Sequence, residues 1–309
     1  MIKNALLVII LMSLISTATL SQTEFYKKGT IDVKMFGGKD AGSSFFNLEG
    51  KVRTEKELPY NKDKKYIFNL TEYIYGARAE YAVSDNFALS LSIPLNYSKL
   101  IEKADTTVIS INNQVSPPDT STETYRKTIG EYSLFQPEYF GIGARYKLYS
   151  KKIQAAWLFE GRIPPGFHRG IHDDPDYEFL SDGAFEALTG FSLNVKFKKS
   201  WLETAILYNY RDEELSDQFI FHTQFGVSTV PGSKLLGFVN FIQSMDSFEH
   251  AVKFDPKETT LQKNLFNLGF MFQLFFSENL YGEFSYKVNL LGKNAWNLGG
   301  FLIGAGARL

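Results

Sequence analysis

The chain of 309 residues contains no cysteine. It therefore has no disulfide, no thiolate metal site and no cysteine that could carry a lipoprotein anchor. An excess charge of one sign is also lacking, because 33 Lys and Arg residues nearly balance 34 Asp and Glu residues. Without a basic or acidic bias, the composition indicates no nucleic-acid partner.

Long hydrophobic runs are missing as well. No apolar segment is long enough to span a bilayer as a helix, and the mean hydropathy is −0.17. Apolar residues alternate with polar ones instead, as in a membrane barrel whose polar inner face lowers the average hydropathy. Aromatic residues make up 16% of the chain, with 28 Phe against 3 Trp. That content suits lipid-facing surfaces and interfacial girdles.

Residues 1–21 have the pattern of a cleaved signal peptide. Lys3 supplies the positive start, and Ala5–Ile15 is apolar but too short to cross a bilayer as a helix. Small residues precede two candidate cleavage positions, after Ala18 and after Ser21. An uncleaved anchor is the alternative. We therefore expect an exported chain.

A period of two residues is the strongest pattern in the rest of the chain. Over Phe87–Ser98, apolar side chains occupy odd positions and small or polar ones even positions, which predicts a β-strand with two different faces. Ten residues at ~3.3 Å each, tilted by about 40°, rise ~25 Å, the height of the apolar band of outer-membrane barrels. The twelve predicted strands are Lys28–Gly37, Thr71–Ser84, Phe87–Leu100, Pro137–Ser150, Ile153–Pro164, Ala184–Lys198, Trp201–Arg211, Gln218–Val230, Lys234–Met245, Lys263–Ser277, Leu280–Leu291 and Ala295–Leu309.

The connections between these strands alternate in length. Tight turns are expected at 85–86, 151–152, 199–200, 231–233 and 278–279, and longer polar loops at 101–136, 165–183, 212–217 and 246–262. The loop 292–294 is a short exception, and Ser44–Arg53 is a candidate extra strand in the polar stretch after the first strand. Short periplasmic turns that alternate with long external loops are typical of bacterial barrels. No linker divides residues 22–309, so we expect one domain.

The two faces of the strands separate a barrel from a soluble β-sandwich, which is the alternative. In Ala184–Lys198, Gln218–Val230 and Leu280–Leu291, one face carries no charge. A Lys or Arg at the bilayer midplane would cost about 2–4 kcal/mol, so lipid demands this absence. The sequence predicts an all-β chain: a monomeric antiparallel transmembrane β-barrel of about 12 strands in the outer membrane of a Gram-negative-type bacterium. Its expected partners are outer-membrane lipids, the barrel-assembly machinery and a small-molecule solute.

Several hairpins resemble those of the outer-membrane protein family named for the meta pathway of phenol degradation. The similar segments are Tyr81–Pro94, Gly143–Tyr149 with Pro164–Gly166, and Gly292–Asn294 before the last strand. The resemblance covers most of the mature chain. It implies a barrel that transports small, often hydrophobic compounds, and it implies no catalytic residues. The chain departs from the usual pattern by ending in Leu309, where an aromatic residue is common.

The inward faces hold the candidate functional residues. Strand parity points these side chains into the lumen: Asp32, Lys34, Arg78, Glu80, Arg145, Lys147, Glu160, Arg162, Glu186, Lys196, Glu203, His222, Glu283 and Lys287. Mixed signs fit a polar pathway that orients a solute. They fit equally well a salt-bridged plug, because twelve strands lie between filled eight-stranded barrels and open porins. The balance of signs argues against a strongly anion-selective lumen.

The remaining chemistry is sparse, and we expect no cofactor and no metal. His168 and His172 share a loop with Asp173, Asp174 and Asp176, but their spacing matches no defined metal motif. A solvated acidic loop is the simpler interpretation. Pro117 and Pro118 mark an extended loop tip.

The expected function is passive passage of small solutes, with no enzymatic activity. A closed structural barrel that presents its loops is the first alternative. An outer-membrane lipid-modifying enzyme is the second, and it would lose turnover on His222→Ala. Such an enzyme needs a serine and a histidine at the lipid boundary, and no strand offers that cluster.

Overall fold

The computed structural model describes residues 26–46, 50–53, 55–58, 61–112, 119–150, 153–164, 185–211, 216–230, 232–245, 264–293 and 295–309. The predicted signal peptide and the whole predicted loop 165–183, which holds His168 and His172, lie outside these ranges, as do Pro117 and Pro118. Within the described ranges, no helix is long and apolar enough to cross a membrane.

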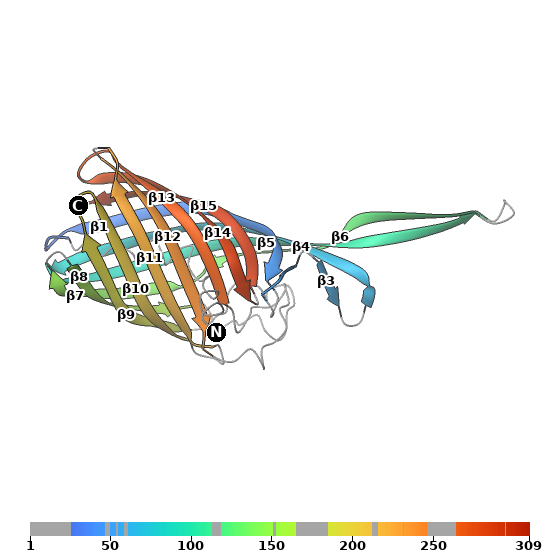
Figure 1. Ribbon diagram of the computed structural model, residues 1–309, viewed down its shortest axis with the longest axis horizontal. Helices are drawn as coiled ribbons and strands as arrows, with labels where there is room; N and C mark the ends of the chain where they lie inside the picture. Colours follow the sequence, from blue (N-terminus) through green and yellow to red (C-terminus); the bar gives the residue numbers. More distant parts are fainter. Residues whose placement is uncertain are drawn as a thin grey trace.

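Twelve antiparallel strands form a closed ring (Figure 1). The first strand closes it, because Val33 pairs with Ala307 on one side and with Ala79 on the other. The predicted fold class is therefore confirmed. In ring order the strands are β1 (Ile31–Phe46), β15 (Ala295–Arg308), β14 (Leu280–Lys293), β13 (Asn264–Phe275), β12 (Ser233–Ser244), β11 (Gln218–Ser228), β10 (Ser200–Arg211), β9 (Glu186–Lys196), β8 (Ile153–Ile163), β7 (Phe140–Ser150), β5 (Phe87–Asn112) and β4 (Asn61–Ser84).

Three described strands lie outside the ring: β2 (Val52–Arg53), β3 (Glu55–Leu58) and β6 (Asp119–Pro137). The last of these pairs with the distal part of β5, from Leu95↔Pro137 to Asn112↔Asp119. The resulting two-stranded ribbon projects far beyond the barrel (Figure 1).

The ribbon corrects one expectation, because the sequence predicts a loop over 101–136. This stretch is rich in Thr, Ile and Val, residues that favour extended backbone. The stretch lacks the regular alternation of apolar and polar residues, so the two-residue period does not predict a strand there. The prediction of one extra strand over Ser44–Arg53 is also wrong, because the first residues of that range belong to β1 and the last two form β2.

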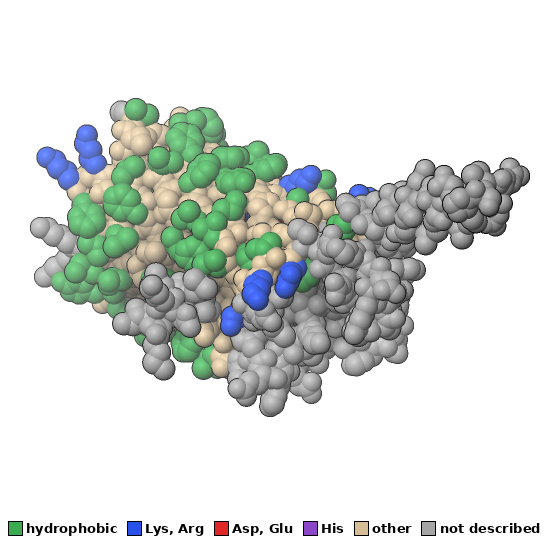
Figure 2. All heavy atoms as spheres, turned by 45° about the vertical axis from the view of Figure 1, so that its right-hand side comes forward, with side chains coloured by type: hydrophobic (Ala, Val, Ile, Leu, Met, Phe, Trp, Pro, Cys, Tyr) green, Lys and Arg blue, Asp and Glu red, His purple; other side chains and the backbone are tan. Residues whose placement is uncertain are grey.

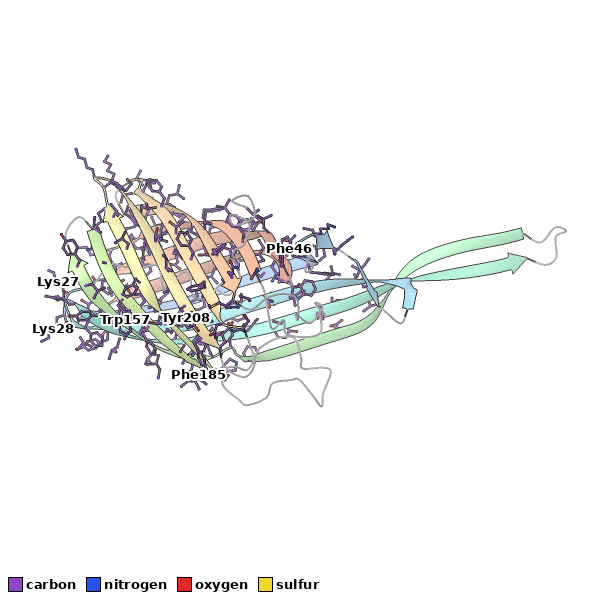
Figure 3. The ribbon with its side chains drawn as sticks, turned by 60° about the horizontal axis from the view of Figure 1, so that its bottom comes forward. Lys27, Lys28, Phe46, Trp157, Phe185 and Tyr208 are labelled. Atoms are coloured by element: carbon purple, nitrogen blue, oxygen red, sulfur yellow. The ribbon has the colours of Figure 1, made fainter. Side chains whose placement is uncertain are left out.

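Tight turns gather at one end of the barrel, which we call the short-turn end. The turn between β11 and β12 contains Gly232 with φ of 80°, a left-handed conformation that glycine adopts without strain. The chain end lies here too, because the Ile31 and Leu309 backbones exchange hydrogen bonds of 2.9 and 2.8 Å. Figure 3 shows Lys27 and Lys28 at this end and Phe46 toward the opposite end.

The outer wall of the barrel is apolar. On β9, Phe191 and Leu193 are 61% and 45% exposed, whereas Ser192 and Asn194, which alternate with them, are buried. Hydrophobic side chains cover the wall seen in Figure 2, and the Lys and Arg side chains in view lie toward its two ends. An apolar surface this extensive is unfavourable in water and matches a hydrocarbon environment.

The inner wall is mixed rather than uniformly polar. Charged and amide side chains occupy most inward positions, but five neighbouring strands also turn apolar residues inward. Register places Leu207 beside Ile220, and Ile220 beside Ile242. The sequence analysis named charged residues and His222 as lumen candidates and included no apolar residue among them. The apolar cluster consists of Leu158, Leu188, Ala205, Leu207, Ile220 and Ile242.

Candidate functional site

Asp32 holds together a cluster at the short-turn end of the lumen. Its carboxylate accepts hydrogen bonds from the hydroxyls of Tyr26 and Tyr281, the latter at 2.9 Å. Arg308 Nε lies 3.6 Å from the same carboxylate. The Arg308 guanidinium also lies 5.0, 5.3 and 5.5 Å from the ring centroids of Tyr26, Phe275 and Tyr281. We call these five residues the Arg308 cluster.

Local structure explains how the Arg308 cluster forms. Asp32 pairs directly with Arg308 across the β1–β15 ladder. Gly306 leaves room for the Tyr281 ring, since a Cβ there would lie 2.2 Å from Tyr281 Cζ. Burial raises the pKa of the Tyr26 phenol above its ordinary value, and the Asp32 carboxylate raises it further. The Tyr26 phenol therefore stays neutral and remains a donor.

Ion pairs continue up the inner wall. Lys34 pairs with Glu283. Glu80 pairs with Arg145 and also lies 3.3 Å from Arg78 Nη2. Each of these side chains is at most 12% exposed. Buried pairs carry a large desolvation cost, so they persist only when both partners are in place.

Asp40 and Lys287 form a further pair, with 3.3 Å between Lys287 Nζ and Asp40 Oδ2. Gly300 makes this possible, because a Cβ at that position would lie 2.0 Å from Asp40 Oδ1. The sequence analysis missed Asp40, since the predicted first strand ends at Gly37 and β1 continues to Phe46.

A further network lies toward the end opposite the short turns, which we call the long-loop end, and joins β8, β9 and β10. Arg162 Nε lies 2.7 Å from Glu160 Oε1, and Arg162 Nη1 lies 3.0 Å from Glu186 Oε2. The other Glu186 oxygen lies 3.1 Å from Arg211 Nε. The Arg162 guanidinium also stacks over Tyr139, with 4.7 Å to the ring centroid. We call these five residues the Arg162 cluster.

Amide side chains form a ladder between the charged clusters. His222 Nδ1 contacts Asn240 Oδ1, and Asn240 Nδ2 donates to Asn267 Oδ1 at 2.9 Å. On the neighbouring strands, Gln224 Nε2 donates to Glu203 Oε2 at 2.8 Å. All five residues are buried, so the ladder lines the lumen, and His222 lies inside the barrel rather than at the lipid boundary.

The predicted lumen residues fall into three groups. Arg78 and Lys147 are partly exposed, and Lys196 is exposed at the short-turn end of β9. The predicted residues that the structure buries are Asp32, Lys34, Glu80, Arg145, Glu160, Arg162, Glu186, Glu203, His222, Glu283 and Lys287.

Sequence reasoning missed Arg211 and Arg308 as well as Asp40. Arg211 shares the parity of Glu203 along β10, which was a usable signal, but it looked like the end of the strand. Arg308 follows a run of small residues at the chain end. Among the described residues, no group of three or more His, Asp or Glu side chains could hold a metal ion.

Taken together, the interior has two kinds of surface. Ion pairs and amides provide hydrogen-bonding groups with little net charge, and the apolar cluster lies beside them. The charged side chains of the two charged clusters are at most 7% exposed, apart from Arg308 at 21%. These charged side chains are therefore packed closely against their neighbours in the interior.

The fold is similar to that of a known channel. It superposes on the crystal structure of the COG4313 outer membrane channel from Pseudomonas putida F1 with a TM-score of 0.61 and 10% identity, covering 93% of this chain and 98% of that one. At this identity the likeness shows the fold alone. The toluene transporter TbuX from Ralstonia pickettii (TM-score 0.44, 8% identity, 92% and 90% covered) and the translocator domain of autotransporter NalP from Neisseria meningitidis (0.43, 8%, 95% and 92%) superpose too loosely to carry an argument.

No protein-family model and no curated protein sequence matches the chain. Of these neighbours, one is described as an outer membrane channel and another as a toluene transporter. The particular family that the hairpins resemble stays a prediction.

Proposed function

We propose that this chain is an outer-membrane channel that lets small solutes cross passively. The observation that carries the proposal is a closed twelve-stranded barrel with an apolar outer wall and a charged, amide-rich inner wall. A soluble protein gains nothing from enclosing so many charges behind an apolar exterior, whereas a solute path through lipid requires both. The fold match to a protein described as an outer membrane channel supports it.

The proposal places the barrel in the outer membrane of a Gram-negative-type bacterium, with the short-turn end toward the periplasm. Short periplasmic turns and longer external loops are the common arrangement in such barrels. A monomer suffices, because the ring closes within one chain. Outer-membrane lipids then contact the wall, and the barrel-assembly machinery inserts the exported chain.

The charged clusters would act as filters on the path. In the Arg162 cluster two carboxylates face two guanidiniums, so neither charge sign dominates there. Passage is then controlled mainly by size and hydrogen bonding rather than by charge. The apolar cluster beside the amide ladder favours solutes with an apolar part.

Single-channel recording in planar bilayers tests the proposal. Purified protein should produce small, discrete conductance steps. A Glu160→Ser/Arg162→Ser double variant keeps the charge balance and shortens two inward side chains of β8, so its steps should be larger. Phe191→Leu, on the lipid-facing side of β9, is the matched control and should leave the steps unchanged. A folded barrel that never conducts would overturn the proposal.

One observation favours a second function. Because the inward side chains are so tightly packed, a closed barrel that presents the β5–β6 ribbon outside the cell is the alternative. It predicts silence in the bilayer from both the parent protein and the double variant. Catalysis forms no part of either proposal, since His222 is enclosed by amide side chains away from lipid.

A further inference from the structure

A pocket of about 670 Å³ opens at the short-turn end of the barrel. Its size falls in the range of small-molecule sites. Three turns and the end of β15 build it. The lining residues are Lys199, Ser228, Thr229, Val230, Gly232, Ser233, Lys234, Phe275, Ser277, Glu278 and Arg308.

The charge of this pocket differs from that of the lumen. Lys199, Lys234 and Arg308 face a single carboxylate, Glu278. The surrounding end of the barrel is also cationic: Lys27, Lys28, Lys196 and Lys198 are all exposed there. Clustered charges of one sign raise the local concentration of oppositely charged solutes. The pocket is therefore suited to anions, although the lumen above it is balanced.

Apolar side chains shape the pocket as much as the cations do. Phe275 and Val230 contribute apolar wall. The Lys234 ammonium lies 5.0 Å from the Phe275 ring centroid and 5.5 Å from that of Trp201. These two cation–π contacts position the ammonium group. A ligand that fills the pocket meets a positioned cation and an aromatic face together.

Arg308 belongs to the pocket and to the Arg308 cluster at once. It lines the cavity and pairs with Asp32 at 3.6 Å, a separation longer than a good charge-assisted hydrogen bond. An anion in the pocket would therefore compete with Asp32 for the guanidinium. Occupancy of the pocket is in this way connected to the Arg308 cluster.

We propose that this pocket binds a small organic anion, with its carboxylate between Lys199, Lys234 and Arg308 and its apolar body against Phe275 and Val230. The inference names the solute class of the channel proposed above and rests on that proposal for its physiological role. Binding itself is measured without transport, so the two can fail separately.

Calorimetric titration of the folded protein in zwitterionic detergent provides the test. Cyclohexanecarboxylate should bind saturably, and the neutral cyclohexylmethanol should bind at least about tenfold more weakly. Lys234→Gln and Lys199→Gln should each weaken carboxylate binding by about tenfold, as expected for the loss of one charge-assisted hydrogen bond. Lys27→Gln, at the same end but outside the pocket lining, should change it by less than about twofold.

Four outcomes would overturn the site. Equal affinity for acid and alcohol would remove the role of charge, and an equal loss in all three variants would reduce the effect to general attraction. Unchanged affinity in Lys234→Gln and Lys199→Gln would place the anion elsewhere.

Lipid phosphate is the competing source of anion, so the titration is repeated in phosphatidylcholine nanodiscs and in phosphatidylglycerol nanodiscs. Loss of carboxylate binding only in the anionic phosphatidylglycerol would assign the pocket to lipid headgroups. Carboxylate binding by a barrel that never conducts would refute the channel and leave the site standing.

Discussion

Removal of the Glu186 charge should destabilise the barrel strongly. Glu186 accepts from Arg162 and Arg211 at 3.0 and 3.1 Å, and the three side chains are 4%, 3% and 0% exposed. In Glu186→Gln the two buried guanidiniums keep only Glu160 as a carboxylate partner within the Arg162 cluster. Removing one partner of a buried ion pair costs about 3–5 kcal/mol, so we expect a loss of that size in the free energy of unfolding.

Denaturant unfolding in detergent, followed by tryptophan fluorescence, measures this loss. Glu131→Gln is the matched control, because Glu131 forms a pair with Lys99 in which the side chains are 55% and 34% exposed. An exposed pair contributes about 0–1 kcal/mol. The double variant Glu186→Gln/Arg211→Gln should recover part of the loss, since it restores charge balance. A Glu186→Gln protein within about 1 kcal/mol of the parent would refute the reasoning.

Two further changes probe the packing and the lipid-facing wall. Gly306→Ala would bring a Cβ within 2.2 Å of the Tyr281 ring. It should lower the free energy of unfolding, measured by thermal unfolding, by about 1–3 kcal/mol. Gly237→Ala is the control and should be nearly neutral, because nothing lies within 4 Å of the added Cβ. Phe191→Arg, at an outward position in mid-strand, should lower stability in vesicles by about 2–4 kcal/mol, and Phe197→Arg, near the short-turn end, by about 0–1 kcal/mol. Equal effects within either pair would contradict the assigned surroundings.

Much of the barrel was visible in the sequence because the signals are local. Alternation in Phe87–Ser98 is a property of neighbouring residues, and it is the same in the strand of the finished barrel. The parity of Glu160 and Arg162 on one strand likewise predicts that both face the same side. Local patterns fail where the environment changes, because β5 runs on to Asn112 beyond the ring, where the alternation of apolar and polar residues is lost.

The pairing of the interior charges depends on contacts between distant parts of the chain. Parity indicates that Glu186 points inward, but only the register of β8, β9 and β10 places it between Arg162 and Arg211. The apolar cluster on the inner wall is a related case. Leu207 shares the parity of Glu203 and Ile220 that of His222, so their inward side could be predicted from the sequence. Only the register of the strands shows that Leu207 and Ile220 meet.

By itself, the sequence determined the twelve strands of the ring, their two faces and the even number needed for closure, because a period of two and a turn residue act over a few positions. The tertiary structure alone decided which inward groups meet. Tyr281 and Asp32 are 249 residues apart and share a hydrogen bond, and Arg308 reaches both the lumen and the short-turn pocket. These contacts exist only when the last strand hydrogen-bonds to the first, and no local pattern in the chain contains that information.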